Sequence, residues 1–365
     1  MRATRHYLVV IAATVLALCS LAAITLWRVA EPFGASATLA DLAELQMKNP
    51  DTIILPFDLR YNGAFKLKRT EQEQPEVIVI SSSRAGTLRA SMFKPYSFYN
   101  LSFTAWTTEQ LLNIFERATH NVHPRAAIIS VDYFLFTERW EKLYSGTRTM
   151  IFDQPFRFMR SNLANFVRTA ALHRPLFDEY LKAPSRYVGT QTILSQEGFR
   201  SDGSYAYSPG RINDARLHSQ TARSLTSSMP GASNMSDRQK APIVRLSELA
   251  RQRGVKLIAV QLPFIRAGVD YLEYEASYRH NSGVWRDFES ESTRNWLSSL
   301  GIAFFDFGRS PIDDDSANFI DAYHPSELGS LRIMQALLAC PEFRADFPDI
   351  DPADIQQQID KTDAR

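Results

Sequence analysis

Short apolar runs alternate with amphipathic stretches along most of the chain. Val77 to Ile80 is an unbroken run of β-branched residues, which is typical of a strand buried on both faces of a parallel sheet. Further runs of this kind lie at 97–103, 126–131 and 255–262, and a shorter, edge-like run lies at 302–307. Helical patterns separate several of them, so we expect an α/β fold: a three-layer, doubly wound, flavodoxin-like parallel sheet.

Three helical patterns in this part of the chain have recognisable ends. Thr107 to Gln110 has the pattern of a capping box and precedes apolar residues at helical spacing, namely Leu111, Ile114, Phe115 and Ala118. A second helix is expected at 241–250, with Gly254 just past its end, and a third at 290–300, halted by Gly301. These helices would cover the faces of the sheet.

The regular pattern also divides the chain into regions. Residues 75–345 form the α/β domain, interrupted at about 135–235 by an irregular insertion rich in aromatic, Arg, Ser, Gly and Pro residues. Within the insertion, residues 198–205 carry an Asp-Gly turn signal. We interpret its aromatic residues as a local core in preference to a ligand cage. Residues 31–74 are expected to be a juxtamembrane connector with one helix, and residues 346–365 a polar C-terminal tail.

The N-terminus carries a long apolar stretch. Residues 7–27 contain no charged side chain and are long enough to cross a bilayer as a helix. Because Arg2 and Arg5 precede this stretch, we expect residues 1–30 to be a signal anchor with a cytoplasmic N-terminus and the rest of the chain translocated. A cleaved signal peptide is the alternative, but the run exceeds a usual signal core and Ala30 offers a poor cleavage site.

Composition narrows the classes of function. The chain has 41 basic and 40 acidic residues mixed along its length, so no electrostatic footprint for nucleic acid is present. Of the two cysteines, Cys19 lies in the apolar stretch, which leaves Cys340 without an exported partner for a disulfide. No spacing of Cys, His, Asp and Glu resembles a metal site, and we expect neither a metal nor a cofactor.

Two polar stretches carry residues suited to nucleophilic catalysis. Ser81 to Arg84 come directly after the first strand, and open α/β sheets bind ligands at the carboxyl ends of their strands. Far along the chain, Asp321 and His324 stand just before a helical apolar stripe. A serine hydroxyl needs a base, and the imidazole needs a third group to fix its tautomer. Each stretch alone is also explained as a helix cap, whereas together they supply a nucleophile, a base and an orienting acid.

These residues resemble the SGNH/GDSL hydrolase superfamily, and most closely its membrane-anchored bacterial branch, which is similar to D-alanyl-transfer proteins of the teichoic-acid pathway and to alginate O-acetylation proteins. In that branch the first block commonly reads G-S-S or G-T-S and the last D-x-x-H-P-S. The resemblance implies that Ser83 is the nucleophile, with Ser82 at the middle position of its block, and that His324 and Asp321 complete the triad. It covers roughly residues 75–135 and 241–340.

The second and third blocks depart from the family pattern. Where the family offers a glycine amide and an asparagine to the oxyanion, this chain has Ser102, after Asn100, and Asp132. Losing one oxyanion donor costs on the order of 100-fold or more in rate. The Ser83 amide with Asn100 or Ser102 would then complete the hole, with Asp132 protonated or turned away. Arg84 is either an ion-pair holder of the loop or a cation that steers an anionic substrate to Ser83.

The resemblance implies a single-pass protein of the bacterial inner membrane with its catalytic domain in the periplasm. It would be a serine-dependent O-acyltransferase or carboxylic-ester hydrolase acting on a cell-envelope polysaccharide or polymer, with a membrane-bound O-acyltransferase as a partner. The alternative is a catalytically weak scaffold that binds glycan or that partner through the insertion, which the substituted oxyanion positions favour. The sequence leaves open the acyl group, the acceptor, and transfer against hydrolysis.

Overall fold

The computed structural model describes residues 2–56, 59–145, 154–182, 186–208, 211, 231–274 and 283–364. Within this part of the chain, the central sheet consists of five parallel strands: β2 (Val77–Ile80), β3 (Phe98–Leu101), β4 (Ala126–Ser130), β8 (Lys256–Gln261) and β9 (Ala303–Asp306). Their spatial order is β3-β2-β4-β8-β9, with β9 at an edge. Numbered along the chain this is 2-1-3-4-5, one of the common doubly wound orders, so the predicted parallel α/β architecture is confirmed.

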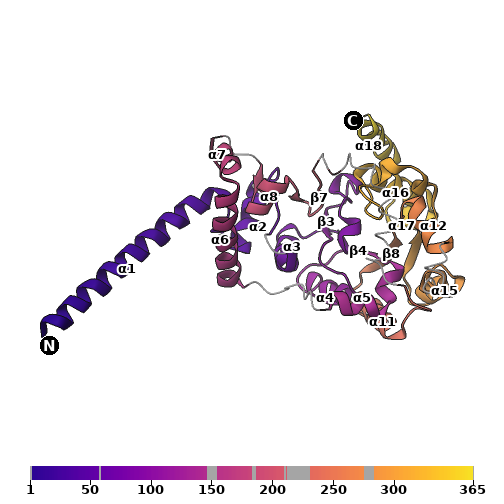
Figure 1. The fold of residues 1–365 in the computed structure, drawn as a ribbon. Coiled ribbons are helices and arrows are strands. Elements are labelled where there is room, and N and C mark those ends of the chain that lie inside the picture. The colour runs from indigo at the N-terminus through magenta and orange to yellow at the C-terminus, as the bar shows by residue number, and fades with distance from the viewer. Residues whose placement is uncertain are drawn as a thin grey trace.

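Helices cover both faces of this sheet (Figure 1). Ile78 and Ile80 of β2 belong to one apolar cluster, together with α4 (Thr108–Ala118), α11 (Asp237–Gln252) and α15 (Glu291–Ser299). Val77 and Val79 face the opposite cluster, which includes α16 (Glu327–Ala339) and α17 (Pro341–Asp346). Alternate residues of one strand thus supply two cores, which is why the run is apolar throughout.

Two of the three predicted helices, α4 and α15, begin where their capping signals place them. Thr107 caps α4, and its hydroxyl accepts a hydrogen bond from the Gln110 amide. The helix expected at 241–250 begins earlier, at Asp237, so Pro242 lies inside α11 and not near its first turn. Two short helices without a strong sequence signal, α12 (Arg266–Tyr274) and α14 (Gly283–Phe288), precede α15.

The insertion is more regular than predicted. Its described residues form α5 (Glu138–Tyr144), α6 (Pro155–Leu172), α7 (Arg174–Lys182) and α8 (Thr190–Ser195). It also contributes the two-residue strands β5 (Tyr187–Val188), β6 (Gly198–Phe199) and β7 (Tyr205–Ala206). The helices α5 and α8 are short, and two-residue strands are too short to show any period.

The connector and the insertion fold together. The connector contains α2 (Leu39–Lys48), α3 (Asn62–Glu73) and β1 (Ile53–Ile54). β1 pairs with β5 and with β6, giving a second sheet of order β5-β1-β6-β7. Aromatic residues of the insertion fill the core beneath this sheet, as interpreted from the sequence, with Phe158 and Phe199 packed beside Tyr61 and Phe65 of the connector. Connector and insertion therefore share one sheet and one core.

The two ends of the chain differ in character. Residues 346–365 were expected to be a polar tail, but most of them lie in α18 (Pro352–Asp363), whose Ile355 and Ile359 are buried in the core beside α16. At the other end, α1 (Arg2–Ala30) projects away from the rest of the molecule (Figure 1). Most of its apolar residues are exposed, and an 18-residue window within His6–Phe33 has a mean hydropathy of 2.6, as expected for a helix able to cross a membrane.

Candidate active site

The structure brings together the three residues that the sequence singles out as a triad. Ser83 comes three residues after the end of β2 and opens a short 3-10 turn, Ser83–Ala85. Its Oγ lies 2.7 Å from Nε2 of His324, although 241 positions separate the two residues. On the other side of the ring, Nδ1 of His324 lies 2.7 Å from Oδ2 of Asp321. A hydroxyl, an imidazole and a carboxylate in this order form the hydrogen-bonded chain of a serine nucleophile, its base and an orienting acid.

A tight turn holds the imidazole. Oδ1 of Asp321 accepts hydrogen bonds from the backbone amides of Tyr323 and His324, at 3.1 and 2.9 Å. The turn closes where the Ile320 amide donates to the His324 carbonyl at 2.8 Å. Ser326 then caps α16 through the Gly329 amide, so the chain is fixed on both sides of His324.

The charge state of Asp321 suits its position at the end of the hydrogen-bonded series from Ser83 through His324. Burial raises the pKa of its carboxyl, but the hydrogen bond and charge of His324 and two backbone amides outweigh burial, so the pKa lies below its usual value. The carboxylate is therefore ionised at neutral pH. An ionised partner at this distance would stabilise an imidazolium formed on His324.

Arg84, beside Ser83, fixes the loop that carries Ser83 through an ion pair. It is 2% exposed, pairs with Asp132 and lies over the Phe264 ring at 3.9 Å. Its remaining hydrogen bonds go to three backbone carbonyls at 2.7–2.9 Å, those of Tyr323, Leu262 and Pro263. The side chain is thus enclosed by protein, and its predicted alternative role, steering an anionic substrate, has no support in this geometry.

Asp132 was expected to be either protonated or turned away from the oxyanion. In the structure its carboxylate points to Arg84 and is turned away. Its other carboxylate oxygen accepts a hydrogen bond from Ser130 Oγ at 3.3 Å. Burial raises the pKa of Asp132 to about 6, against the opposing effect of Arg84. Asp132 therefore secures the ends of β2 and β4 and supplies no donor to an oxyanion.

Asn100 is also used internally, which corrects its prediction as an oxyanion donor. Its Nδ2 donates to the carbonyls of Ala85 and Leu88 at 2.8 and 2.9 Å, and its Oδ1 accepts from the Ser102 amide at 2.7 Å. Ser102 Oγ, in contrast, is buried and has no hydrogen-bond partner among the described residues. Ser82 Oγ accepts from the Arg84 amide at 3.4 Å and caps the turn.

A hairpin of the insertion packs against residues 81–86, the nucleophile loop that carries Ser83, a feature that the sequence did not reveal. The Tyr205 amide donates to the Gly86 carbonyl at 2.6 Å, and its ring stacks on Phe103 at 4.6 Å. Two residues further on, the ring of Tyr207 lies 6.4 Å from that of His324, between ring centroids. The Asp-Gly signal correctly predicts the turn between β6 and β7, but nothing local in the sequence says where the hairpin docks.

The hairpin is anchored by charged residues. Asp202 Oδ2 accepts from the Ala90 amide at 2.8 Å, and Arg200 forms an ion pair with Glu327 at the start of α16. Lys66 of the connector is fully buried and donates to the carbonyls of Asn100 and Gly203, at 2.9 and 2.7 Å. Connector, insertion and α/β domain therefore meet at the candidate site.

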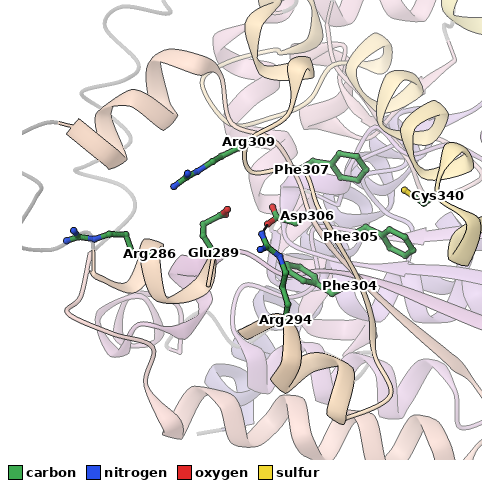
Figure 2. A pocket seen from close by; sticks show the side chains of 9 residues that line it. All are labelled: Arg286, Glu289, Arg294, Phe304, Phe305, Asp306, Phe307, Arg309 and Cys340. Atoms are coloured by element: carbon green, nitrogen blue, oxygen red, sulfur yellow. Dashed lines mark hydrogen bonds and ion pairs between the residues drawn. The ribbon is translucent and has the colours of Figure 1, made fainter. Parts of the chain in front are cut away.

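A separate cavity of about 610 Å³ lies along β9, at the far edge of the sheet from β3. Figure 2 shows its polar centre, where Arg294 lies 2.6 Å from Asp306, with Glu289 nearby. Burial and the charge of Asp306 raise the pKa of Glu289 to about 7. No triad residue lines this cavity. Within the described part of the chain, no three His, Cys, Asp or Glu side chains are grouped as metal ligands.

In comparisons with known proteins, no protein-family model matches the chain, and no curated protein is significantly similar to it. The chemistry of the site therefore has to be inferred from its own geometry and from the two sequence blocks that form it. Both point to a nucleophilic serine in a doubly wound α/β fold.

Proposed function

We propose that the protein is a serine-dependent O-acyltransferase or carboxylic-ester hydrolase of the SGNH type. The observation that carries the proposal is the continuous chain from Ser83 through His324 to Asp321, with both links at 2.7 Å. It stands at the carboxyl end of a central strand, where doubly wound sheets bind their ligands. The D-x-x-H-P-S block and the position of the serine support the SGNH type within this class.

In the proposed reaction, Ser83 Oγ attacks an acyl carbonyl while His324 Nε2 accepts its proton. The leaving alcohol takes that proton, and an acyl ester remains on Ser83. A sugar hydroxyl or water, deprotonated by His324, then attacks the ester carbonyl; the acyl bond to Ser83 Oγ breaks, and His324 returns the proton to that oxygen. Asp321 stabilises the imidazolium in both steps. The Ser83 amide and the Ser102 hydroxyl are the proposed oxyanion donors, since Asn100 and Asp132 are used internally.

The proposed setting is the bacterial inner membrane. Residues 7–27 within α1 would span it once and leave the α/β domain in the periplasm, next to envelope polysaccharides or polymers as acceptors or substrates. A membrane-bound O-acyltransferase is proposed as a partner by family analogy. Arg2 and Arg5, before the span, support this orientation.

Covalent chemistry at Ser83 can be tested with a fluorophosphonate probe on the full-length protein. Wild type is expected to be labelled, and Ser83→Ala to lose labelling completely. The matched control is Ser82→Ala, which removes the neighbouring hydroxyl and should retain labelling. Asp321→Asn is expected to slow labelling on the order of 10⁴-fold, because the imidazole loses its orienting carboxylate. Equal labelling of wild type and Ser83→Ala would refute the proposal.

A catalytically weak scaffold remains the second candidate, favoured by the internal use of Asn100 and Asp132. It predicts that cells carrying Ser83→Ala keep normal acylation of their envelope polymer. The enzyme hypothesis predicts loss of that acylation at equal protein level. Deleting residues 135–235 would not discriminate, because the hairpin within them contacts the nucleophile loop.

A further inference from the structure

α6 and α7 pack against the base of α1. Ala30, the last residue of α1, and Phe33, in the short turn that follows, are both buried in a cluster with these helices. The Phe33 ring centroid lies 5.1 Å from that of Phe166 on α6 and 5.1 Å from that of Phe177 on α7. Trp27, near the end of the apolar stretch, lies about two helical turns before Phe33, so this cluster is close to the expected membrane boundary. Figure 1 shows α6 at the side of the molecule that faces α1.

The outward side of α6 carries exposed apolar side chains. Phe156 is 80% exposed and Val167 45%. Phe156, Val167 and Ala171 are separated by close to whole turns, so they project from one side of the helix, and Ala164 is exposed beside them. Phe158 and Phe166 already fill the inner side. The exposed apolar side chains are thus surplus to the core, which usually marks an interaction surface.

The charges on the same surface are all positive. Arg157, Arg160 and Arg168 are exposed, and α6 contains no acidic residue. Arg157 and Arg168 donate to neutral amide oxygens, those of Gln154 and Asn165. Apolar side chains flanked by arginine, without acidic residues, are typical of a helix that lies in the interface of an anionic bilayer. Arginine stems can cover apolar surface while their guanidinium groups reach the phosphates.

We propose that α6 lies on the bilayer surface as a second membrane contact, with Phe156, Val167 and Ala171 in the interface and Arg157, Arg160 and Arg168 on anionic phospholipid headgroups. The inference rests on the proposed membrane anchoring by α1. A single span leaves the attached domain free to tilt, whereas a second contact about one helix diameter from its end fixes the orientation of the domain. The candidate site would then hold a constant height above the membrane.

The test uses full-length protein in nanodiscs of phosphatidylcholine and phosphatidylglycerol, with an environment-sensitive fluorophore on one cysteine at a time. The native Cys19 reports on α1 in a Cys340→Ser background, and Ala164→Cys reports on α6 after Cys19→Ser is added. Ser298→Cys, exposed on α15, is the matched control away from α6. Brominated lipid is expected to quench the Cys19 and Ala164 labels about twofold or more and to leave the Ser298 label unchanged.

The outcomes separate this inference from the proposals on which it rests. Quenching at Cys19 without quenching at Ala164 would refute the surface contact and leave the span intact. A water-exposed Ala164 label that becomes shielded only when native membrane proteins are added would refute it in favour of a protein partner. Loss of quenching at both sites would refute the anchoring as well. Fluorophosphonate labelling of Ser83 is independent of all three results.

A second variant tests the role of charge. Replacing Arg157, Arg160 and Arg168 together by Gln removes three positive charges from an exposed surface, so folding should be preserved. Quenching of the Ala164 label is then expected to fall about twofold or more and to lose its dependence on phosphatidylglycerol content. Unchanged quenching with unchanged lipid dependence would contradict the assigned role of the arginines.

Discussion

The guanidinium of Arg84 joins the two halves of the candidate triad. Its backbone follows Ser83, while its Nε donates to the carbonyl of Tyr323, the neighbour of His324, at 2.9 Å. The same group neutralises Asp132 and reaches the end of β8 through the carbonyls of Leu262 and Pro263. Arg84 is therefore best described as a positioning residue that fixes the nucleophile loop relative to the base.

The contribution of Arg84 to folding stability can be measured separately from its effect on the position of Ser83. Arg84→Met should cost about 3–5 kcal/mol in unfolding free energy, because Asp132 is left buried and unpaired. Adding Asp132→Leu should recover most of that loss in denaturant unfolding. Fluorophosphonate labelling of the double variant should stay about 10-fold slow, because the Tyr323 carbonyl has lost its donor. Arg89→Met, at a partly exposed ion pair, is the control. Labelling of the double variant at the wild-type rate would reduce Arg84 to a stabilising residue.

At the level of elements, the β6–β7 hairpin connects the insertion to the site. The turn of this hairpin is hydrogen-bonded to β3, where the Asp202 carbonyl accepts from the Asn100 amide at 2.8 Å. Gly203 adopts φ +79°, and a Cβ there would lie 2.3 Å from the Asn100 carbonyl oxygen. Only a glycine satisfies both the left-handed backbone and this close approach.

Gly203→Ala is therefore expected to loosen the hairpin. Gly301→Ala is the matched control, because Gly301 also has a left-handed φ, +74°, but open space around its Cβ position. The control should lose about 1 kcal/mol of unfolding free energy for its backbone. Gly203→Ala should lose about 1–3 kcal/mol more, and label more slowly at Ser83, because the hairpin that carries Tyr207 must move. Equal losses in the two variants would show that the hairpin contact is not tight.

At the scale of the whole molecule, the cavity beside β9 gives folding stability a pH dependence. Glu289 has a pKa of about 7 in the folded protein, against an ordinary value of 4.5, mainly because of burial. Between these two values the folded state keeps a proton that the unfolded chain has released. Stability contributed by this group therefore falls as pH rises from about 4.5 to about 7.

Glu289→Gln removes this dependence. The variant should exceed wild type in unfolding free energy by about 1–3 kcal/mol at pH 8 and match it closely at pH 4, as measured by denaturant titration across pH. Glu248→Gln, on the exposed side of α11, is the control and should follow wild type. A wild-type slope that persists in Glu289→Gln would assign the pH dependence to another group.

The sequence by itself determined what depends on local patterns. The buried run at Val77, the cap at Thr107 and the Asp-Gly turn each predict their element, because a strand's burial, a cap and a turn are encoded within a few residues. Ser83, Asp321 and His324 could also be singled out from the two polar blocks, because the order and spacing of residues within each block can be read from the sequence.

Only the tertiary structure decided how distant segments meet. Asn100 and Asp132 looked free to face a substrate, but their partners come from other strands and loops, and a charge or amide finds its partner only when the fold is complete. The aromatic insertion formed helices and a docked hairpin, and the polar C-terminus became a packed helix, because contacts with a core outweigh weak local propensity. Local sequence thus specified elements and reactive groups, while long-range packing determined which of those groups remain available for chemistry.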